Sequence, residues 1–172
     1  GRLKQLRHNE TLAAVGDRVV ISILEDSSGV IEEIKQRRTE FFRMAPTARG
    51  DFKQVLLANL DQAVFIFACA DPQPSLRMLD RFLVIAEKQR IQAIIVANKI
   101  DLVGLESAQK IFGVYKDVGY ELIYTSVKEN IHIDVLRERL VGRISAFSGP
   151  SGAGKSSLLN RLLGQERAIV SP

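Results

Sequence analysis

A glycine-rich octapeptide, GPSGAGKS at residues 149–156, limits the fold of this chain more than any other feature. It follows an apolar segment and leads directly into a stretch with helical periodicity, which is the context in which such a pattern binds phosphate. Glycines let the backbone wrap around phosphate groups with its N–H groups pointing inward, and the start of the following helix adds a favourable field. The octapeptide therefore predicts a nucleotide-binding α/β domain.

The residues from 55 onward alternate between apolar runs and amphipathic stretches. We expect strands at 62–68, 93–97, 121–124 and 144–147, and helices at about 75–89, 105–118, 134–140 and 155–163. The expected strands are short and rich in Val, Ile, Leu and Phe, which is typical of parallel strands covered on both faces. This alternation predicts a mostly parallel sheet with helices on both faces.

The tetrapeptide NKID at residues 98–101 follows the second expected strand and so emerges at the carboxyl edge of the sheet, where open α/β folds bind ligands. An ionised Asp101 can accept hydrogen bonds from both N1–H and N2–H of guanine, and adenine offers no such pair of donors. Because such bonds are worth about 1.5–3 kcal/mol each, their loss would disfavour adenine by roughly two to four orders of magnitude. Asn and Asp at the end of a strand are also common turn residues, so the tetrapeptide alone leaves that alternative open.

A second polar segment, Thr125–Lys128, follows the next expected strand. The backbone N–H near Val127 could donate to guanine O6, and the aliphatic stems of Lys99 and Lys128 could cover the two faces of the base. Taken alone, this segment could equally be a solvated loop. Three such segments, each at the end of a buried strand, nevertheless describe one guanine-nucleotide pocket.

Roles within this pocket follow from residue type. Lys155 is the predicted catalytic residue, because its ammonium reaches the β and γ phosphates, and the Ser156 hydroxyl is the predicted Mg²⁺ ligand. The predicted GTP contacts are Asn98, Lys99, Asp101, Ser126, Val127, Lys128, Gly149, Pro150, Ser151, Gly152, Ala153, Gly154, Lys155, Ser156 and Ser157.

The base-reading segment precedes the phosphate loop, whereas ordinary GTPases have the opposite order. The chain is therefore predicted to contain a circularly permuted P-loop GTPase domain.

The N-terminal part has a different pattern. Two β-branched runs, 18–24 and 30–34, flank an Asp/Ser/Gly turn and predict a hairpin, with a third strand at 41–43. We expect a partial OB-fold β-barrel at 1–45, a linker at 46–54 marked by Pro and Gly, and the GTPase domain at 55–172. The basic residues after the hairpin, Lys35, Arg37 and Arg38, are predicted to contact RNA phosphates, although a solvated turn would have the same composition.

Composition adds a few limits. The net charge of +4 permits a polyanionic partner without requiring one. The single cysteine, Cys69, lies in an apolar run and is expected to be a core residue, and it cannot form a zinc site with the separated His8 and His132. The longest apolar run, Ala63–Ala70, is much shorter than the roughly 20 residues that span a bilayer, so we expect a cytoplasmic protein.

With these motifs in place, the chain resembles the circularly permuted GTPases of the ribosome small-subunit-dependent GTPase A family, also called RsgA or YjeQ. The resemblance extends over nearly all of the chain. It is carried by VGDRV at 15–19, NLDQ at 59–62, LDRFL at 79–83, NKIDL at 98–102 and GKSSLLN at 154–160.

The resemblance implies an N-terminal OB-fold that contacts ribosomal RNA, a permuted GTPase domain that binds GTP or GDP with Mg²⁺, and Zn²⁺ only in a C-terminal domain beyond residue 172. It implies a factor for late maturation of the small (30S) ribosomal subunit, whose GTP hydrolysis that subunit stimulates. We expect a monomer with no membrane contact. We also expect a piece of a longer protein that stops before the switch regions and hydrolyses GTP poorly alone.

Two other functions fit the same residues less well. The chain could be a non-catalytic RNA-binding module in which guanine nucleotide is structural, or an enzyme that uses ATP for phosphoryl transfer. GTP hydrolysis measured with and without small ribosomal subunits distinguishes the RNA-binding module from the GTPase. Competition between ATP and GTP for binding distinguishes the ATP-using enzyme.

Overall fold

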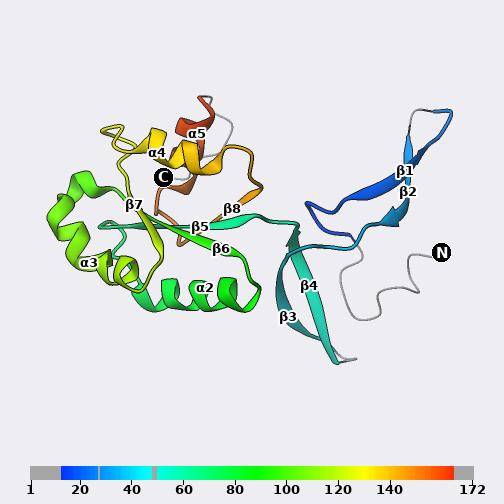
Figure 1. The fold of residues 1–172 in the computed structure, drawn as a ribbon, viewed down its shortest axis with the longest axis horizontal. Coiled ribbons are helices and arrows are strands. Elements are labelled where there is room, and N and C mark those ends of the chain that lie inside the picture. The colour runs from blue at the N-terminus through cyan, green and yellow to red at the C-terminus, as the bar shows by residue number, and fades with distance from the viewer. Residues whose placement is uncertain (1–12, 27, 48–49, 165–172) are drawn as a thin grey trace. The chain divides into compact units, whose positions relative to one another are not determined.

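The computed structural model describes residues 13–26, 28–47 and 50–164, and these fall into two compact units, Gly1–Leu60 and Asp61–Pro172. The first unit is built from antiparallel strands, and the second from a parallel sheet with helices (Figure 1). No helix in the described part of the chain combines the length and the apolar composition that crossing a bilayer requires.

In the residues that the structure describes, the first unit contains two antiparallel hairpins. In one, β1 (Val19–Ile23) pairs with β2 (Gly29–Ile34), and in the other, β3 (Glu40–Thr47) pairs with β4 (Gly50–Ala58). The turn of the first hairpin is held by Asp26, whose carboxylate accepts hydrogen bonds from the Ser28 backbone N–H at 2.9 Å and from the Ser28 hydroxyl at 2.6 Å. The hairpin expected around this turn is confirmed.

The segment expected as a linker, 46–54, instead forms part of the second hairpin. Pro46 lies opposite Asp51 in the register of β3 and β4, and the compact unit continues to Leu60. Pro is tolerated in a strand at the edge of a sheet, and both strands of a two-stranded ribbon are edges. The Pro and Gly of this segment therefore mark a hairpin and not a domain boundary.

The segment 15–17 is joined to the end of β4 and to Asn59, which follows β4. Val15 forms a parallel bridge with Leu57, and the buried Asn59 side chain accepts from the Arg38 N–H at 2.9 Å and donates to the Gly16 carbonyl at 2.9 Å. Gly16 has φ +90°, and a Cβ there would lie 2.2 Å from the Ala58 carbonyl oxygen. The segments 15–17 and 59–62, which carry part of the family resemblance, thus meet through Asn59.

The second unit has a four-stranded parallel sheet in the order β7-β6-β5-β8. Its strands are β5 (Gln62–Ala68), β6 (Gln92–Asn98), β7 (Glu121–Tyr124) and β8 (Ser145–Ser148). Its helices are α2 (Leu76–Lys88), the short η1 (Ile100–Leu102), α3 (Leu105–Asp117), α4 (Ile133–Leu140) and α5 (Lys155–Leu163). The strands and helices expected from the alternating pattern are confirmed to within a few residues.

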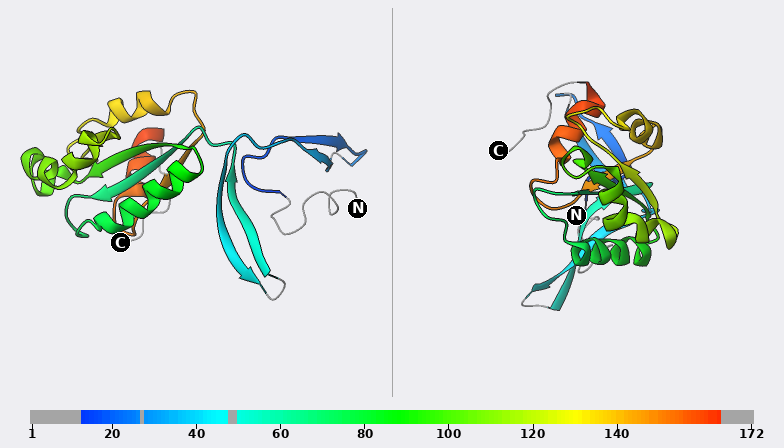
Figure 2. Two further views of the ribbon diagram at one scale, coloured as in Figure 1. Left: turned by 60° about the horizontal axis from the view of Figure 1, so that its bottom comes forward. Right: turned by 90° about the vertical axis from the view of Figure 1, so that its left-hand side faces the viewer.

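Successive side chains of a strand point to opposite faces of its sheet. Helices cover both faces of the sheet formed by β5 and β6 and their neighbours (Figures 1 and 2). One face packs against α4 and α5 in a core of Val64, Ile66, Ile94, Val96, Ile123, Ile133, Leu136, Ala153 and Leu158. On the other, Phe65 and Phe67 contact Phe82 of α2, with ring centroids 5.4 and 6.2 Å apart. Strands buried on both faces explain the continuous apolar runs in the sequence.

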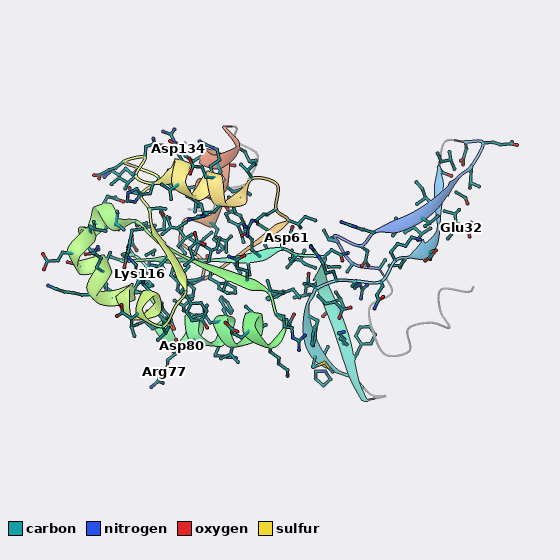
Figure 3. All side chains as sticks on the ribbon, viewed as in Figure 1. Glu32, Asp61, Arg77, Asp80, Lys116 and Asp134 are labelled. Atoms are coloured by element: carbon teal, nitrogen blue, oxygen red, sulfur yellow. The ribbon has the colours of Figure 1, made fainter. Side chains whose placement is uncertain are left out.

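The helices α2 and α3 are joined by a side-chain hydrogen bond. The Tyr115 hydroxyl of α3 donates to the carboxylate of Asp80 at 2.7 Å. Asp80 is labelled on α2 in Figure 3. Burial, together with this carboxylate, raises the pKa of Tyr115. The bond fixes α3 on the same side of the sheet as α2.

Cys69 follows β5 directly and is a core residue, as expected. Its side chain is buried, and burial, with a smaller effect of the Asp101 carboxylate, raises the pKa of Cys69 to about 12. The thiol is therefore protonated and is not a reactive nucleophile.

Candidate functional site

The glycine-rich loop lies between β8 and α5, as the octapeptide predicts. Gly149 and Gly154 have φ values of +152° and +90°, in a region that favours glycine. A Cβ on Gly149 would lie 2.0 Å from the Ile66 carbonyl oxygen, and one on Gly154 would lie 2.4 Å from the Asn98 amide nitrogen. The loop therefore approaches its neighbours so closely that only glycine fits at these two positions.

The start of α5 is electropositive, because it carries the Lys155 ammonium and the free N–H groups of the helix N-terminus. Lys155 is the first residue of the helix, and its Nζ donates to the carbonyl oxygens of Gly149 at 3.0 Å and Pro150 at 2.7 Å. The first turn of α5 contains no acidic residue, and its N-cap, Gly154, provides no side-chain cap. Because the first N–H groups of a helix have no partner within it, this end of α5 attracts an anion such as phosphate.

Asn98 connects the phosphate loop to the base-reading segments. Its side chain is buried at the end of β6, where Nδ2 donates to the Ala153 carbonyl at 3.0 Å and Oδ1 accepts from the Thr125 hydroxyl at 3.0 Å. One amide thus fixes three segments that are far apart in sequence. Because both hydrogen bonds of the Asn98 side chain are to protein groups, Asn98 fixes the position of the phosphate loop relative to the segment that begins at Thr125.

Asp101 lies in η1, and its carboxylate is oriented by a neighbouring hydroxyl. Ser126 Oγ donates to Asp101 Oδ1 at 2.6 Å and accepts from the Glu129 N–H at 3.1 Å. The backbone N–H of Ile100 donates to the Thr125 carbonyl at 3.2 Å, which joins the two base-reading segments. The predicted residues Asp101 and Ser126 therefore come together, with Ser126 supporting the carboxylate.

A cleft of about 400 Å³ lies between these segments and the start of α5. It is lined by Asp71, Asn98, Lys99, Asp101, Leu102, Val127, Lys128, Gly154 and Ser157. The structure thus brings most residues predicted to contact a guanine base to one cleft, beside the phosphate loop. The predicted contacts Gly149, Pro150, Ser151, Gly152, Ala153, Lys155 and Ser156 belong to that loop and the first turn of α5.

Sequence reasoning missed Asp71 as a lining residue. It follows β5, whose carboxyl end lies at the same edge of the sheet as those of β6 and β8. The rule that ligands bind at the carboxyl edge of a parallel sheet applies to this loop as well, and it would have identified the residue.

One residue predicted to contact RNA is not available to it. The Arg37 side chain is only 2% exposed, and its Nε and Nη2 donate to Asp17 at 2.7 and 2.8 Å while Nη1 donates to Glu40 at 3.2 Å. The hydrogen bond to Asp17 is the main cause of a raised pKa of Arg37. Arg37 is therefore part of a buried ion-pair network, whereas Lys35 and Arg38 are exposed and stay predictions.

Comparisons with known proteins identify relatives along most of the chain. A model of the family described as RsgA GTPase matches residues 34–171. The small ribosomal subunit biogenesis GTPase RsgA of Clostridium botulinum (strain Eklund 17B / Type B) is 38% identical over 166 residues, a region of 96% of this chain and 53% of that protein. The protein of the same name from Alkaliphilus metalliredigens (strain QYMF) is 40% identical over 160 residues, 92% of this chain and 51% of that one.

Solved structures agree with these matches. YjeQ from Thermotoga maritima has a TM-score of 0.73 and 34% sequence identity, over 94% of this chain and 53% of its own. YloQ, described as a circularly permuted GTPase, has a TM-score of 0.63 and 31% identity, over 86% of this chain and 48% of its own. The chain spans about half the length of the relatives it matches. With the family model matched from residue 34 to residue 171, this chain belongs to the RsgA GTPase family.

Proposed function

We propose that this chain is the guanine-nucleotide-binding part of a cytoplasmic GTPase that acts in late maturation of the small (30S) ribosomal subunit. The observation that supports this best is the position of Asn98, whose amide joins the Ala153 carbonyl of the phosphate loop to the Thr125 hydroxyl of the base-reading segment. The two halves of a nucleotide site thereby form one cleft. The relatives are named as small ribosomal subunit biogenesis GTPases.

In this proposal the cleft selects guanine through Asp101. Its carboxylate accepts from guanine N1–H and N2–H while Ser126 holds it in place, and the Val127 N–H donates to O6. The stems of Lys99 and Lys128 cover the faces of the ring. Adenine would leave Asp101 without either donor, which explains the preference.

The phosphates lie in the loop 149–154 and against the start of α5. Lys155 supplies positive charge to the β and γ phosphates, which stabilises the charge that develops during phosphoryl transfer. Ser156, in the first turn of α5, has the hard oxygen ligand that Mg²⁺ prefers, and Mg²⁺ when bound neutralises and orients the triphosphate. Zn²⁺ stays an expectation from the family resemblance and has no part in this proposal.

RNA contact is proposed for the first unit. Lys35 and Arg38 are exposed there, and exposed cations near an RNA strand gain from counterion release. The partner in this proposal is the small ribosomal subunit with its RNA, bound by one copy of the protein.

The test is single-turnover GTP hydrolysis by the full-length protein, with and without small ribosomal subunits. We expect the subunit to accelerate hydrolysis and expect Lys155→Met, which keeps a long apolar stem without the charge, to abolish the acceleration. If the subunit binds but leaves hydrolysis unchanged, the protein is an RNA-binding module in which nucleotide is structural. If ATP competes better than GTP for binding, the guanine-selective assignment is wrong.

A further inference from the structure

The loop that follows β5, residues 69–75, reaches both halves of the nucleotide site. It begins with Cys69, whose N–H donates to the Asn98 carbonyl at 2.8 Å and so ties the loop to the end of β6. Two residues later, Asp71 has φ +46° and lines the 400 Å³ cleft. A residue with a Cβ is uncommon in this left-handed conformation, and Asp is among those that tolerate it best.

The backbone of Asp71 holds a residue of the base-reading segment. Lys99 Nζ donates a short hydrogen bond to the Asp71 carbonyl oxygen. Lys99 Cε lies 4.0 Å from the position that a Cβ on Gly154 would take. The stem of Lys99 therefore runs between the loop 69–75 and the start of α5, along the wall of the cleft.

The next residue of the loop touches the phosphate side of the site. Pro72 Cδ lies 3.2 Å from the position of a Cβ on Gly152, which itself has φ +74°. The segment Asp71–Pro72 thus contacts the base-reading loop through a hydrogen bond and the phosphate loop through packing.

We propose that Asp71 is a positioning residue of the nucleotide site, which fixes the Lys99 side chain across the face of the bound base. This inference rests on the proposed guanine-nucleotide function. A free lysine samples many rotamers and loses that freedom when a ligand orders it, whereas a lysine already bonded to a carbonyl loses less. The left-handed backbone of Asp71 aims that carbonyl at the ammonium, so its contribution depends on backbone conformation and not on the carboxylate.

The test is GDP binding to the full-length protein by titration calorimetry. Asp71→Val should weaken GDP binding about 10-fold, because a β-branched residue disfavours the left-handed region, and Asp71→Ala should weaken it less. Asn and Gly both tolerate the left-handed conformation, so the variants Asp71→Asn and Asp71→Gly should bind GDP like the parent protein. The control is Arg90→Val, at a left-handed position of φ +54° after α2, which should leave GDP binding unchanged.

A double-mutant cycle separates positioning from a general loss of structure. Lys99→Ala should weaken GDP binding, and adding Asp71→Val to it should cause little further loss, because Asp71 acts through Lys99. If the two losses multiply, or if Asp71→Val and Asp71→Ala both bind GDP like the parent, the inference is wrong. If the parent protein binds no GDP, the proposed function fails and this inference fails with it.

Discussion

Gly149 of the phosphate loop is required because the loop passes close to the neighbouring strand β5. The Cβ of an alanine at 149 would lie 2.0 Å from the carbonyl oxygen of Ile66, which belongs to a strand paired on both sides. That backbone atom cannot move without disturbing the sheet. The requirement for glycine at 149 is therefore structural as well as functional.

We expect Gly149→Ala to lower the free energy of unfolding by about 2–4 kcal/mol, from steric overlap added to backbone strain. Gly119→Ala is the control, because Gly119 also has a positive φ, +103°, but a Cβ there meets nothing within 4 Å. This control should lose only the strain, about 1–2 kcal/mol. Urea denaturation of both variants measures the difference, and equal losses would show that the close approach to Ile66 is wrong.

The buried thiol of Cys69 offers a second check on a single side chain. Its pKa of about 12 means that the native thiol stays protonated at pH 8, so a disulfide reagent should modify it only after unfolding. As the pH rises above the ordinary thiol pKa of about 9, the unfolded state ionises first, so stability should fall up to pH 12. Fast modification of the native protein at pH 8 would contradict the buried position.

Among the elements of the first unit, the ion pairs around Arg37 join the segment between β2 and β3 to Asp17 and Glu40. Lys53 of β4 also pairs with Glu40, so the network reaches both strands of the second hairpin. The Arg37 and Asp17 side chains are 2% and 3% exposed, so neither can exchange its partner for water. Removal of Arg37 would leave the Asp17 carboxylate buried without the guanidinium that neutralises its charge.

Arg37→Met should therefore destabilise the first unit by about 3–5 kcal/mol. The control Lys35→Met removes an exposed cation whose contact with Glu33 is 3.5 Å long, and it should change stability by about 0–1 kcal/mol. Denaturant unfolding followed by circular dichroism measures both. Similar losses for the two variants would contradict the buried network.

Acid should weaken the same network through Glu40. Burial favours the protonated carboxyl, yet hydrogen bonds from Lys53 and Arg37 together outweigh it, so the pKa of Glu40 lies below its ordinary value of 4.5. A lowered carboxyl pKa contributes stability above the unfolded pKa, and this contribution is lost as the pH falls through the folded pKa. The denaturant concentration at the unfolding midpoint should thus fall as the pH drops below 4.5. Glu40→Gln should reduce this pH dependence of stability. An unchanged pH profile in this variant would remove Glu40 from the account.

The elements also show what sequence could and could not predict. The parallel strands were predictable because burial on both faces leaves continuous apolar runs such as 62–68. The hairpin β3–β4 was missed because Pro46 was interpreted as a linker residue. Burial of Arg37 depends on Asp17, 20 residues away, and only the fold shows that the two meet. The role of Asp71 depends on its backbone conformation, which an Asp-Pro pair does not reveal.

The two compact units have different construction, and the nucleotide cleft belongs entirely to the second. All strands of that sheet are parallel, so the loops after β5, β6, β7 and β8 lie at one edge. The strand that carries the phosphate loop, β8, is the last described strand of this sheet in sequence and pairs with β5, the first. The site therefore depends on the position of these loops in space and not on their order in sequence, so a chain with the permuted order still brings the predicted base-reading segments and the phosphate loop to one cleft.

In the proposed function, Asp101 selects guanine in a cleft shared with the phosphate loop. Titration calorimetry of GDP and xanthosine diphosphate, with the parent protein and with Asp101→Asn, tests it most directly. Xanthine carries an oxygen where guanine carries N2, so the new amide can donate to it. The control Asp117→Asn changes an exposed carboxylate at the end of α3 and should have no effect.

We expect the parent protein to prefer GDP and Asp101→Asn to lose at least about 100-fold in GDP affinity, the equivalent of two charged hydrogen bonds, while it gains affinity for xanthosine diphosphate. Unchanged GDP affinity in Asp101→Asn would contradict the account.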